Sequence, residues 1–349
     1  MIGAALSLRA RLFGSVGNTL LTVAMLALFA SYLPVLLRWA VFDATWWAAS
    51  PAACRAAGGA CWAFVHEKFR LVLFGRYPFE EQWRPLIALL LTIVLVLAGC
   101  SLRFGWRSVI AGGLAGFLAV IVLMRGGVLG LSLVPTDLWG GLPLTVFLAV
   151  GGIIGAFPIA VVLALGRRSE LGVIRGISVI YIEMVRGVPL VSVLFMASFM
   201  IPLFLPGKLQ VDALLRALIA ITLFSAAYLA EAIRGGLQAV PAGQEQAAKA
   251  LGLGYWQTSL LIVVPQALRL AIPAIANLFI GLFKDTSLVG IVGLTDLLLA
   301  TKQALGDPQW RSFSLEAYLF VALLYVAFCS FISLYSRVLE KRTRQHQPS

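Results

Sequence analysis

Four consecutive polar residues, Lys284-Asp285-Thr286-Ser287, interrupt an otherwise apolar stretch of the chain. An ionisable group inside a membrane-spanning segment is energetically costly and usually functional. One interpretation is a gate or binding element inside a helical bundle, because adjacent positive and negative groups could meet the carboxylate and the ammonium of a zwitterion. The alternative is an internal ion pair or a local bend.

Two further carboxylates are each followed by an arginine three residues later: Glu183 by Arg186, and Glu231 by Arg234. Residues at this spacing are neighbours on a helix surface. The spacing slightly favours one satisfied ion pair on each helix, and both glutamates also stay candidates for such an element. Asn277, in an apolar run, is a further candidate, although a hydrogen bond between helices would equally explain it.

Two of the four cysteines, Cys54 and Cys61, lie in one polar segment of residues 43–84. This segment is too charged to span a membrane, and we place it outside the cell membrane. An oxidising compartment favours pairing of the two cysteines, and the consecutive glycines between them permit a tight closure. The sequence therefore predicts a Cys54–Cys61 disulfide.

Several kinds of site have no support in the sequence. There is no Gly-x4-Gly-Lys-Ser/Thr loop, so the chain is not expected to bind ATP in the manner of a P-loop protein. His66 and His346 are the two histidines, and they do not support a metal or catalytic cluster. His66-Glu67 begins like the zinc-protease pattern H-E-x-x-H, but its fifth residue is Arg70. We expect no cofactor, no metal and no enzymatic activity in this chain.

The composition indicates what must position these residues. The chain is 61% hydrophobic and 12% charged, whereas a soluble domain has about 25% charged residues. Its 349 residues therefore predict one helical membrane bundle in lipid rather than two soluble domains. A net charge of +12 suggests nucleic acid in a soluble protein. Here it more plainly reflects Lys and Arg at the cytoplasmic ends of spans, and no nucleic-acid partner is expected.

About eight membrane spans are predicted, because a span needs about 20 mostly apolar residues. Their ranges are 19–42, 85–100, 108–123, 141–165, 189–205, 213–232, a seventh from near Pro265 or Pro273 to 292, and 316–337. Two prolines in the seventh span predict an elbow rather than one straight helix. Basic residues flank nearly every inner end, which places both termini in the cytoplasm.

The segment between the sixth and seventh spans is the least apolar long stretch between two hydrophobic runs. It reads PAGQEQAAKALGLGYWQTSLLIVVP, from Pro241 to Pro265. Its alanines favour a helix, and Gly252 and Gly254 are suited to end it. The sequence predicts a short surface helix whose small residues let a partner approach closely, or an ordinary loop helix tucked under its own bundle.

This segment resembles the cytoplasmic coupling loop of ABC-importer permeases, with the pattern E-A-A, three residues, G, nine residues, I-x-L-P. The matching residues are Gln246-Ala247-Ala248, Gly252, Ile262, Val264 and Pro265, with Gln246 in place of Glu and Val264 in place of Leu. Three more motifs look like the polar-amino-acid branch of this family: 183–190 (EMVRGVPL), 227–236 (AYLAEAIRGG) and 284–288 (KDTSL). Residues 54–64 and 74–78 resemble the permeases of general L-amino-acid importers.

The resemblance implies an all-α, polytopic type I ABC-importer permease. Its parts would be an N-terminal three-span extension (1–140) with the outer loop (43–84), a transmembrane core (141–338) with the coupling helix (241–256), and a basic cytoplasmic tail (339–349). The expected coupling residues are Gly243, Gln246, Ala247, Ala248, Leu251 and Gly252. The expected pathway residues are Glu183, Glu231, Asn277, Lys284, Asp285, Thr286 and Ser287.

The resemblance also implies partners and a location. These are a second, similar permease, two ATP-binding subunits that hydrolyse ATP, an extracytoplasmic amino-acid-binding protein, and the bacterial inner membrane. The expected function is ATP-driven import of L-amino acids. The rival is a secondary transporter driven by an ion gradient, with Glu183, Glu231 or Asp285 as ion sites. No internal repeat is evident in the sequence, which weakens this rival.

Overall fold

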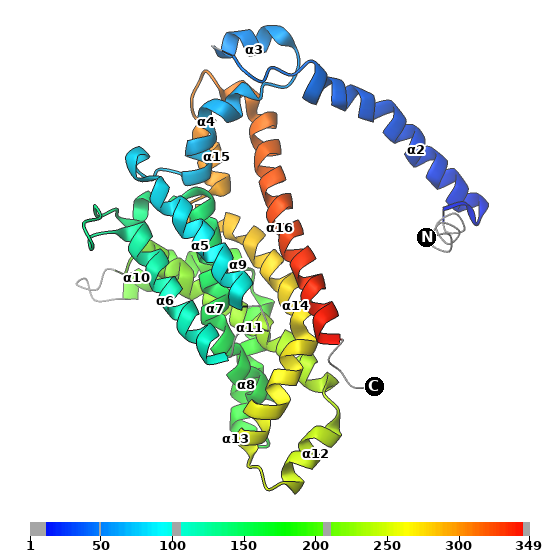
Figure 1. Ribbon diagram of the computed structural model, residues 1–349, viewed down its shortest axis with the longest axis vertical. Helices are drawn as coiled ribbons and strands as arrows, with labels where there is room; N and C mark the ends of the chain where they lie inside the picture. Colours follow the sequence, from blue (N-terminus) through cyan, green and yellow to red (C-terminus); the bar gives the residue numbers. More distant parts are fainter. Residues whose placement is uncertain (1–11, 49, 100–105, 205–210, 345–349) are drawn as a thin grey trace. The chain divides into compact units, whose positions relative to one another are not determined.

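The computed structural model describes residues 12–48, 50–99, 106–204 and 211–344. These residues are predominantly α-helical, as Figure 1 shows. The helices are α2 (Val16–Leu37), α3 (Pro51–Ala57), α4 (Ala63–Phe74), α5 (Trp83–Gly99), α6 (Trp106–Arg125), α7 (Gly141–Arg167), α8 (Gly172–Gly187), α9 (Leu190–Phe195), α10 (Ile201–Phe204), α11 (Ala213–Ala239), α12 (Ala242–Ala250), α13 (Tyr255–Gln257), α14 (Val264–Asp285), α15 (Leu297–Ala304) and α16 (Ser314–Arg344). The short strand β1 is Thr295–Asp296.

The helices confirm an all-α polytopic membrane protein. Six helical segments of the described chain are long and apolar enough to cross a membrane. They are Val16–Phe42, Phe79–Gly99, Gly141–Arg167, Ala213–Ala239, Tyr255–Val292 and Arg311–Lys341. A seventh span arises if α8 and the following α9–α10 segment, bent by 101° between them, are counted as one. The shorter apolar part of α6 is the remaining candidate, so the number eight stays a prediction.

The seventh predicted span begins earlier than the sequence suggests. It starts at Tyr255, passes through the π-helical segment Thr258–Val263 and continues in α14. Pro265 lies where the helix changes from π-helical to α-helical hydrogen bonding. Pro273 lies inside α14, and a proline is tolerated in membrane helices when neighbouring groups satisfy the backbone. Neither proline therefore starts the span.

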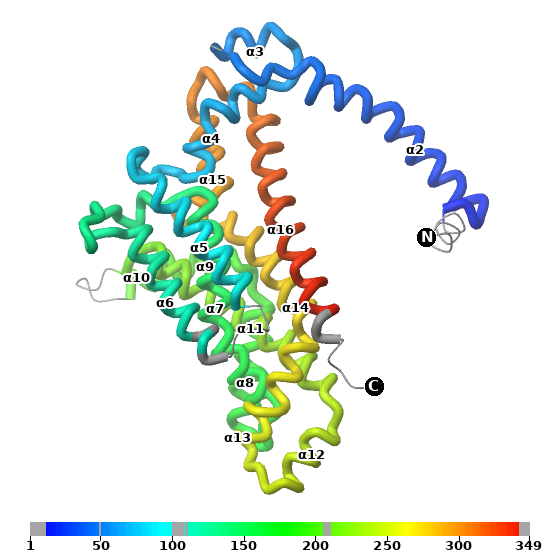
Figure 2. Tube along the Cα trace, viewed as in Figure 1, coloured from blue at the N-terminus to red at the C-terminus, as the bar shows by residue number. Residues whose placement is uncertain are grey.

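The coupling segment forms the short helix α12, which ends as its glycine predicts. Gly252 has a φ of 77°, in the left-handed region. Its N–H group donates to the carbonyl of Lys249 at 3.0 Å, and the N–H group of Leu253 donates to that of Ala248 at 3.1 Å. These two bonds are the Schellman pattern of a glycine-terminated helix. Figure 2 shows the chain leaving α11, forming α12 and returning through α13.

The chain divides into two compact units. The first contains residues 1–69 and 305–318. In it, Cys54 and Cys61 form a disulfide with their Cα atoms 5.5 Å apart. The Glu316 carboxylate accepts a hydrogen bond from the Cys61 N–H group at 3.0 Å. The Lys68 ammonium donates to Asp307 at 2.9 Å and lowers the pKa of that carboxyl group. No residue of α2 is buried.

The second unit contains residues 70–304 and 319–349 and is built around α7. Helix α7 packs against α11, α8, α5 and α14. Ala156, Ala160 and Ala164 lie one turn apart on α7 and are fully buried. Small side chains at this spacing allow membrane helices to approach closely. The predicted boundary between residues 140 and 141 falls inside this unit and stays a prediction about the transport core.

Helices α11 and α14 cross at a glycine. A Cβ atom on Gly236 of α11 would lie 2.2 Å from the carbonyl oxygen of Ala267 in α14. No real Cβ contact is so short, so any larger residue at this position would push the two helices apart. Helices α11 and α14 are therefore held in close contact, and together with α7 they form the candidate site.

Candidate functional site

Helices α7, α11 and α14 line a partly open cavity of about 200 Å³, which we call the first cavity. Its lining residues are Ile153, Phe224, Ser225, Tyr228, Asn277, Leu278, Gly281, Leu282 and Asp285. Asn277, Gly281 and Asp285 are four residues apart, so they share one face of α14. The cavity thus combines apolar walls with a few polar groups, a composition typical of small-molecule sites.

The structure separates the polar residues that are consecutive in the sequence. Lys284 and Asp285 are both exposed, but Asp285 lines the first cavity and Lys284 does not. Consecutive residues on a helix point about 100° apart, and in this helix the rotation takes Lys284 out of the cavity lining. Thr286 is fully buried and donates its hydroxyl hydrogen to the carbonyl of Phe283 at 2.7 Å. Ser287 is half-buried and also lies outside the lining.

A network of five charged residues joins α7, α8 and α11, and we call it the ionic layer. Its members are Arg167, Glu183, Arg186, Glu231 and Arg234. The Arg167 guanidinium donates to Glu231 and to Glu183, each at 3.0 Å. Arg234 donates twice to the Glu231 carboxylate, and an Arg186 nitrogen lies 3.8 Å from it.

The local pairs expected from the sequence form only in part. Glu231 and Arg234 pair within α11, as their spacing predicts. Glu183 instead bonds to Arg167, which comes from α7. The arginine three residues after Glu183, Arg186, has Glu231 as its nearest partner among the described residues. The network is therefore a connection between three helices rather than two separate pairs.

Tyr228 links the first cavity to the ionic layer. Its ring lines the cavity, its hydroxyl group donates to the carbonyl of Arg186 at 3.3 Å, and the Arg186 guanidinium lies 5.7 Å from the ring centre. Glu231 and Arg234 follow Tyr228 at intervals of three residues, so they lie near it along one side of α11. The same helix thus carries first the cavity and then the ionic layer.

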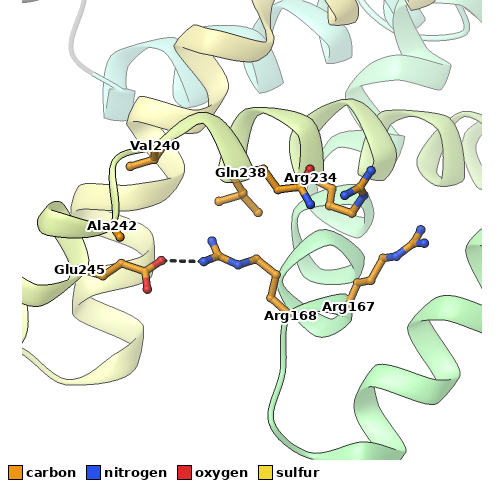
Figure 3. A pocket seen from close by; sticks show the side chains of 8 residues that line it. Arg167, Arg168, Arg234, Gln238, Val240, Ala242 and Glu245 are labelled. Atoms are coloured by element: carbon orange, nitrogen blue, oxygen red, sulfur yellow. Dashed lines mark hydrogen bonds and ion pairs between the residues drawn. The ribbon is translucent and has the colours of Figure 1, made fainter.

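A second cavity of about 410 Å³ lies where α7, α11 and α12 meet. Its lining residues are Arg167, Arg168, Arg234, Leu237, Gln238, Val240, Ala242 and Glu245. The Arg168 guanidinium donates to the Glu245 carboxylate at 2.8 Å. In Figure 3, Arg168 points toward Glu245, and Arg167 points away from it. The ionic layer therefore borders the first cavity through Tyr228 and the second cavity through Arg167 and Arg234.

Helix α12 exposes most of the residues predicted to couple to a partner. Gly243, Gln246 and Ala247 are exposed, and Leu251 keeps 80% of its surface accessible. We call these four residues the docking face. Ala248 is 1% exposed and packs inward, so it is not part of the docking face in the single chain. It is one residue, or about 100° of helix rotation, away from Ala247.

Sequence reasoning missed several residues of this site. Arg167 and Arg168 follow the fourth predicted span, where a basic pair signals no more than a helix end at the membrane surface. Glu245 and Tyr228 had no signal of their own, because their partners Arg168 and Arg186 lie far away in the sequence. Tyr255 and Trp256, which follow the docking face, are also exposed.

Comparison with known proteins shows one family. Residues 156–345 match the family model described as binding-protein-dependent transport system inner membrane component. The inner membrane amino-acid ABC transporter permease protein YhdY of Escherichia coli (strain K12) is 47% identical over 336 residues, which cover 96% of this chain and 91% of that protein. The glutamate/glutamine/aspartate/asparagine transport system permease protein BztC of Rhodobacter capsulatus is 36% identical over 411 residues. The alignment covers 99% of this chain and 94% of that protein.

A solved structure shows the same helical arrangement in part of the chain. The crystal structure of an amino acid ABC transporter with histidines aligns with a TM-score of 0.50 and 27% sequence identity. The alignment covers 57% of this chain and 90% of the chain in that structure. The similarity thus extends over most of that chain and over the larger part of this one.

Proposed function

The chain belongs to the family of binding-protein-dependent transport system inner membrane components, and from this membership we propose that it carries L-amino acids across the bacterial inner membrane. It is a permease subunit, and ATP hydrolysis belongs to separate subunits. The main support for the substrate class is the 47% identity, over nearly the whole chain, with an amino-acid ABC transporter permease. The general L-amino-acid importer subgroup is our finer proposal.

The first cavity is the proposed substrate chamber. Asp285 offers a carboxylate to a substrate ammonium group, Asn277 and Ser225 offer hydrogen bonds, and Phe224 and Leu278 offer apolar contact. An excess of negative charge in the cavity lining suits the ammonium group that all amino acids share. Lys284 does not line this cavity, so it is not proposed as the partner of the substrate carboxylate. The carboxylate is left for hydrogen-bond donors such as Asn277.

The ionic layer closes the proposed pathway on its cytoplasmic side. It lies between the first cavity and the second, and it ties three helices together by charged hydrogen bonds. Glu183 and Glu231 thus act in the pathway as parts of a gate rather than as ligands of the substrate. Opening the layer would connect the chamber to the second cavity and to the cytoplasm, in the manner of alternating access.

The proposed partners follow from the family and from the exposed surface of α12. An ATP-binding subunit docks on the docking face, a second permease carries a second such subunit, and an extracytoplasmic binding protein delivers the amino acid. The coupling helix then lies in the cytoplasm, with both termini on the same side. The ion-gradient-driven alternative has no support from the family, and the carboxylates assigned to it are accounted for by arginines (Glu183 and Glu231) and by the first cavity (Asp285).

Uptake by the purified complex in liposomes tests the function. We expect accumulation of L-amino acids to require ATP on the side of the ATP-binding subunits and the binding protein on the opposite side. The measurement is initial uptake of labelled amino acid, with and without ATP, and with and without an imposed proton or sodium gradient. Uptake that follows the gradient and ignores ATP would contradict the proposal.

Asp285→Asn is expected to reduce amino-acid uptake by about tenfold or more. The substitution keeps the size of the side chain but removes the charge that meets the substrate ammonium, and a hydrogen bond to a charged group contributes about 1.5–3 kcal/mol. The matched control is Lys284→Gln, since Lys284 is adjacent but lies outside the cavity. Uptake at the wild-type rate in Asp285→Asn would remove Asp285 from the pathway.

A further inference from the structure

We propose that the neighbouring residues Arg167 and Arg168 transmit the movement of α12 to the ionic layer. In this inference, Glu245 of α12 pulls on Arg168, and the displacement of Arg168 withdraws Arg167 from Glu183 and Glu231. The ATP-binding subunits would thereby open the gate through one specific ion pair. The inference rests on the proposed function, and it names the residues that couple docking to gating.

The two arginines are adjacent in the chain but bind different parts of the structure: Arg167 belongs to the ionic layer, and Arg168 binds Glu245 of α12. Both lie at the end of α7, where Arg168 is the residue that caps the helix. Their Cα atoms are joined by one peptide unit and are therefore about 3.8 Å apart. Figure 3 shows their side chains diverging, with Arg168 directed toward Glu245 and Arg167 away from it. A shift of the backbone at one residue must move the other, because no flexible segment separates them.

The contact between α7 and α12 crosses an open space. The second cavity, about 410 Å³ in volume, is lined by Arg168, Glu245 and Ala242. Helix α12 has its main packing contact elsewhere, with the π-helical segment Thr258–Val263. The Arg168–Glu245 pair is the ion pair between α7 and α12 among the described residues. Helices α7 and α12 are therefore connected by an ion pair across a cavity. This arrangement leaves α12 room to move.

The exposure of this pair also fits a transmitting role. The side chains of Arg168 and Glu245 are 38% and 37% exposed. Exposed ion pairs add little to the stability of a fold, so the pair is not needed to hold the chain together. Arg167, by contrast, is 25% exposed and donates to two carboxylates on two helices. A small displacement at its end of α7 affects both of these bonds at once.

The inference also accounts for a departure in the coupling motif. Position 246 carries Gln where the family has Glu, and the carboxylate of this helix is one residue earlier, at Glu245. One residue on a helix is a rotation of about 100°. Gln246 is exposed on the docking face, while Glu245 turns toward the second cavity. In this chain the acidic group of α12 thus serves an intramolecular contact.

Charge reversal tests the pair in the complete transporter. The variants are Arg168→Glu, Glu245→Arg and the double variant that exchanges the two charges, each in the complex reconstituted in liposomes. We expect each single variant to lower the amino acid taken up per ATP hydrolysed by at least about fivefold, the lower end of typical coupling effects. The ATP-binding subunit should still co-purify and hydrolyse ATP. The exchanged pair should restore uptake per ATP toward the wild-type value.

Two control variants remove a charge without touching the pair. Arg175→Gln changes an exposed arginine near the start of α8, and Lys249→Gln changes an exposed residue of α12 itself. Neither residue has an ion pair among the described residues, and both variants should couple normally. A purely structural role for the pair would lower assembly and hydrolysis together with uptake, and it would leave uptake per ATP unchanged.

The outcomes separate the inference from the function beneath it. If both single variants take up a normal amount of amino acid per ATP hydrolysed, the inference is wrong, whereas the proposed function still holds. The same conclusion follows if the single variants are uncoupled but not rescued by the exchanged pair. Wild-type uptake that does not need ATP would overturn the proposed function, and the inference would go with it. Rescue by the exchanged pair, together with normal control variants, would establish the transmission.

Discussion

Replacing Ala247 by arginine is expected to reduce co-purification of the ATP-binding subunit about tenfold or more, while the permease still folds in the membrane. Ala247 is exposed in the docking face of α12, so a larger side chain meets nothing within the chain. In a close contact with a partner, added side-chain volume costs about 1–3 kcal/mol. The charge adds to this cost if the partner buries it. The measurement is the yield of the ATP-binding subunit in a pull-down with the tagged permease.

The choice of position matters for this experiment. Gly252 is part of the coupling motif, but its φ of 77° means that any side chain there strains the backbone. A substitution at Gly252 could therefore reduce co-purification either by distorting α12 or by blocking the docking contact, and the experiment would not separate the two effects. Gly172→Arg is the matched control, because Gly172 is exposed at the start of α8 and a Cβ atom there would have open space. Normal co-purification and normal stimulated hydrolysis in Ala247→Arg would show that α12 is not the dock.

Replacing Glu231 by glutamine is expected to loosen the gate. Glu231 is the shared acceptor of Arg167 and Arg234 and the nearest carboxylate to Arg186. The amide cannot balance these charges, and three neighbouring guanidinium groups then repel one another. The free energy that holds the ionic layer together should fall by an amount between two limits. The lower limit is the roughly 0–1 kcal/mol of an exposed ion pair, and the upper limit is the roughly 3–5 kcal/mol lost when a buried pair is broken. We expect labelled amino acid loaded into liposomes to flow out without ATP at a rate about tenfold above wild type.

A graded control accompanies this prediction. Glu183 belongs to the same ionic layer but makes one hydrogen bond, to Arg167, and its side chain is 53% exposed. Glu183→Gln should therefore give a smaller rise in outflow than Glu231→Gln. Hydrolysis without the binding protein should rise in the same order. Equal outflow in wild type and Glu231→Gln would show that the ionic layer does not close the pathway.

Local patterns in the sequence predicted local structure well. The glycines after residue 251 predicted the end of α12, and Gly252 adopts the left-handed conformation that only glycine takes without strain. Long apolar runs predicted most of the helices that cross the membrane, because length and hydropathy decide this property. The pair Glu231–Arg234 also follows from spacing on one helix.

Contacts between helices were beyond the reach of these patterns. The sequence assigns Arg186 to Glu183, but tertiary packing brings Arg167 to Glu183 from another helix. The orientation of single residues was equally hard to predict. Lys284 and Asp285 are adjacent in the chain, yet one lines the first cavity and the other does not. Ala247 and Ala248 divide in the same way between the surface and the interior. The rotation of a helix about its axis depends on its neighbours.

The composition of the ionic layer has a consequence for the energised membrane. The layer holds three arginines, Arg167, Arg186 and Arg234, against two glutamates, Glu183 and Glu231. Its formal charge is therefore positive, and arginine stays protonated at any physiological pH. Moving one elementary charge across a membrane potential of about 100 mV changes its free energy by about 2.3 kcal/mol. A positive constriction opposes the entry of protons and sodium ions, so if the ionic layer closes the pathway as proposed, we expect the closed permease to hold back the ions that would otherwise discharge the proton-motive force.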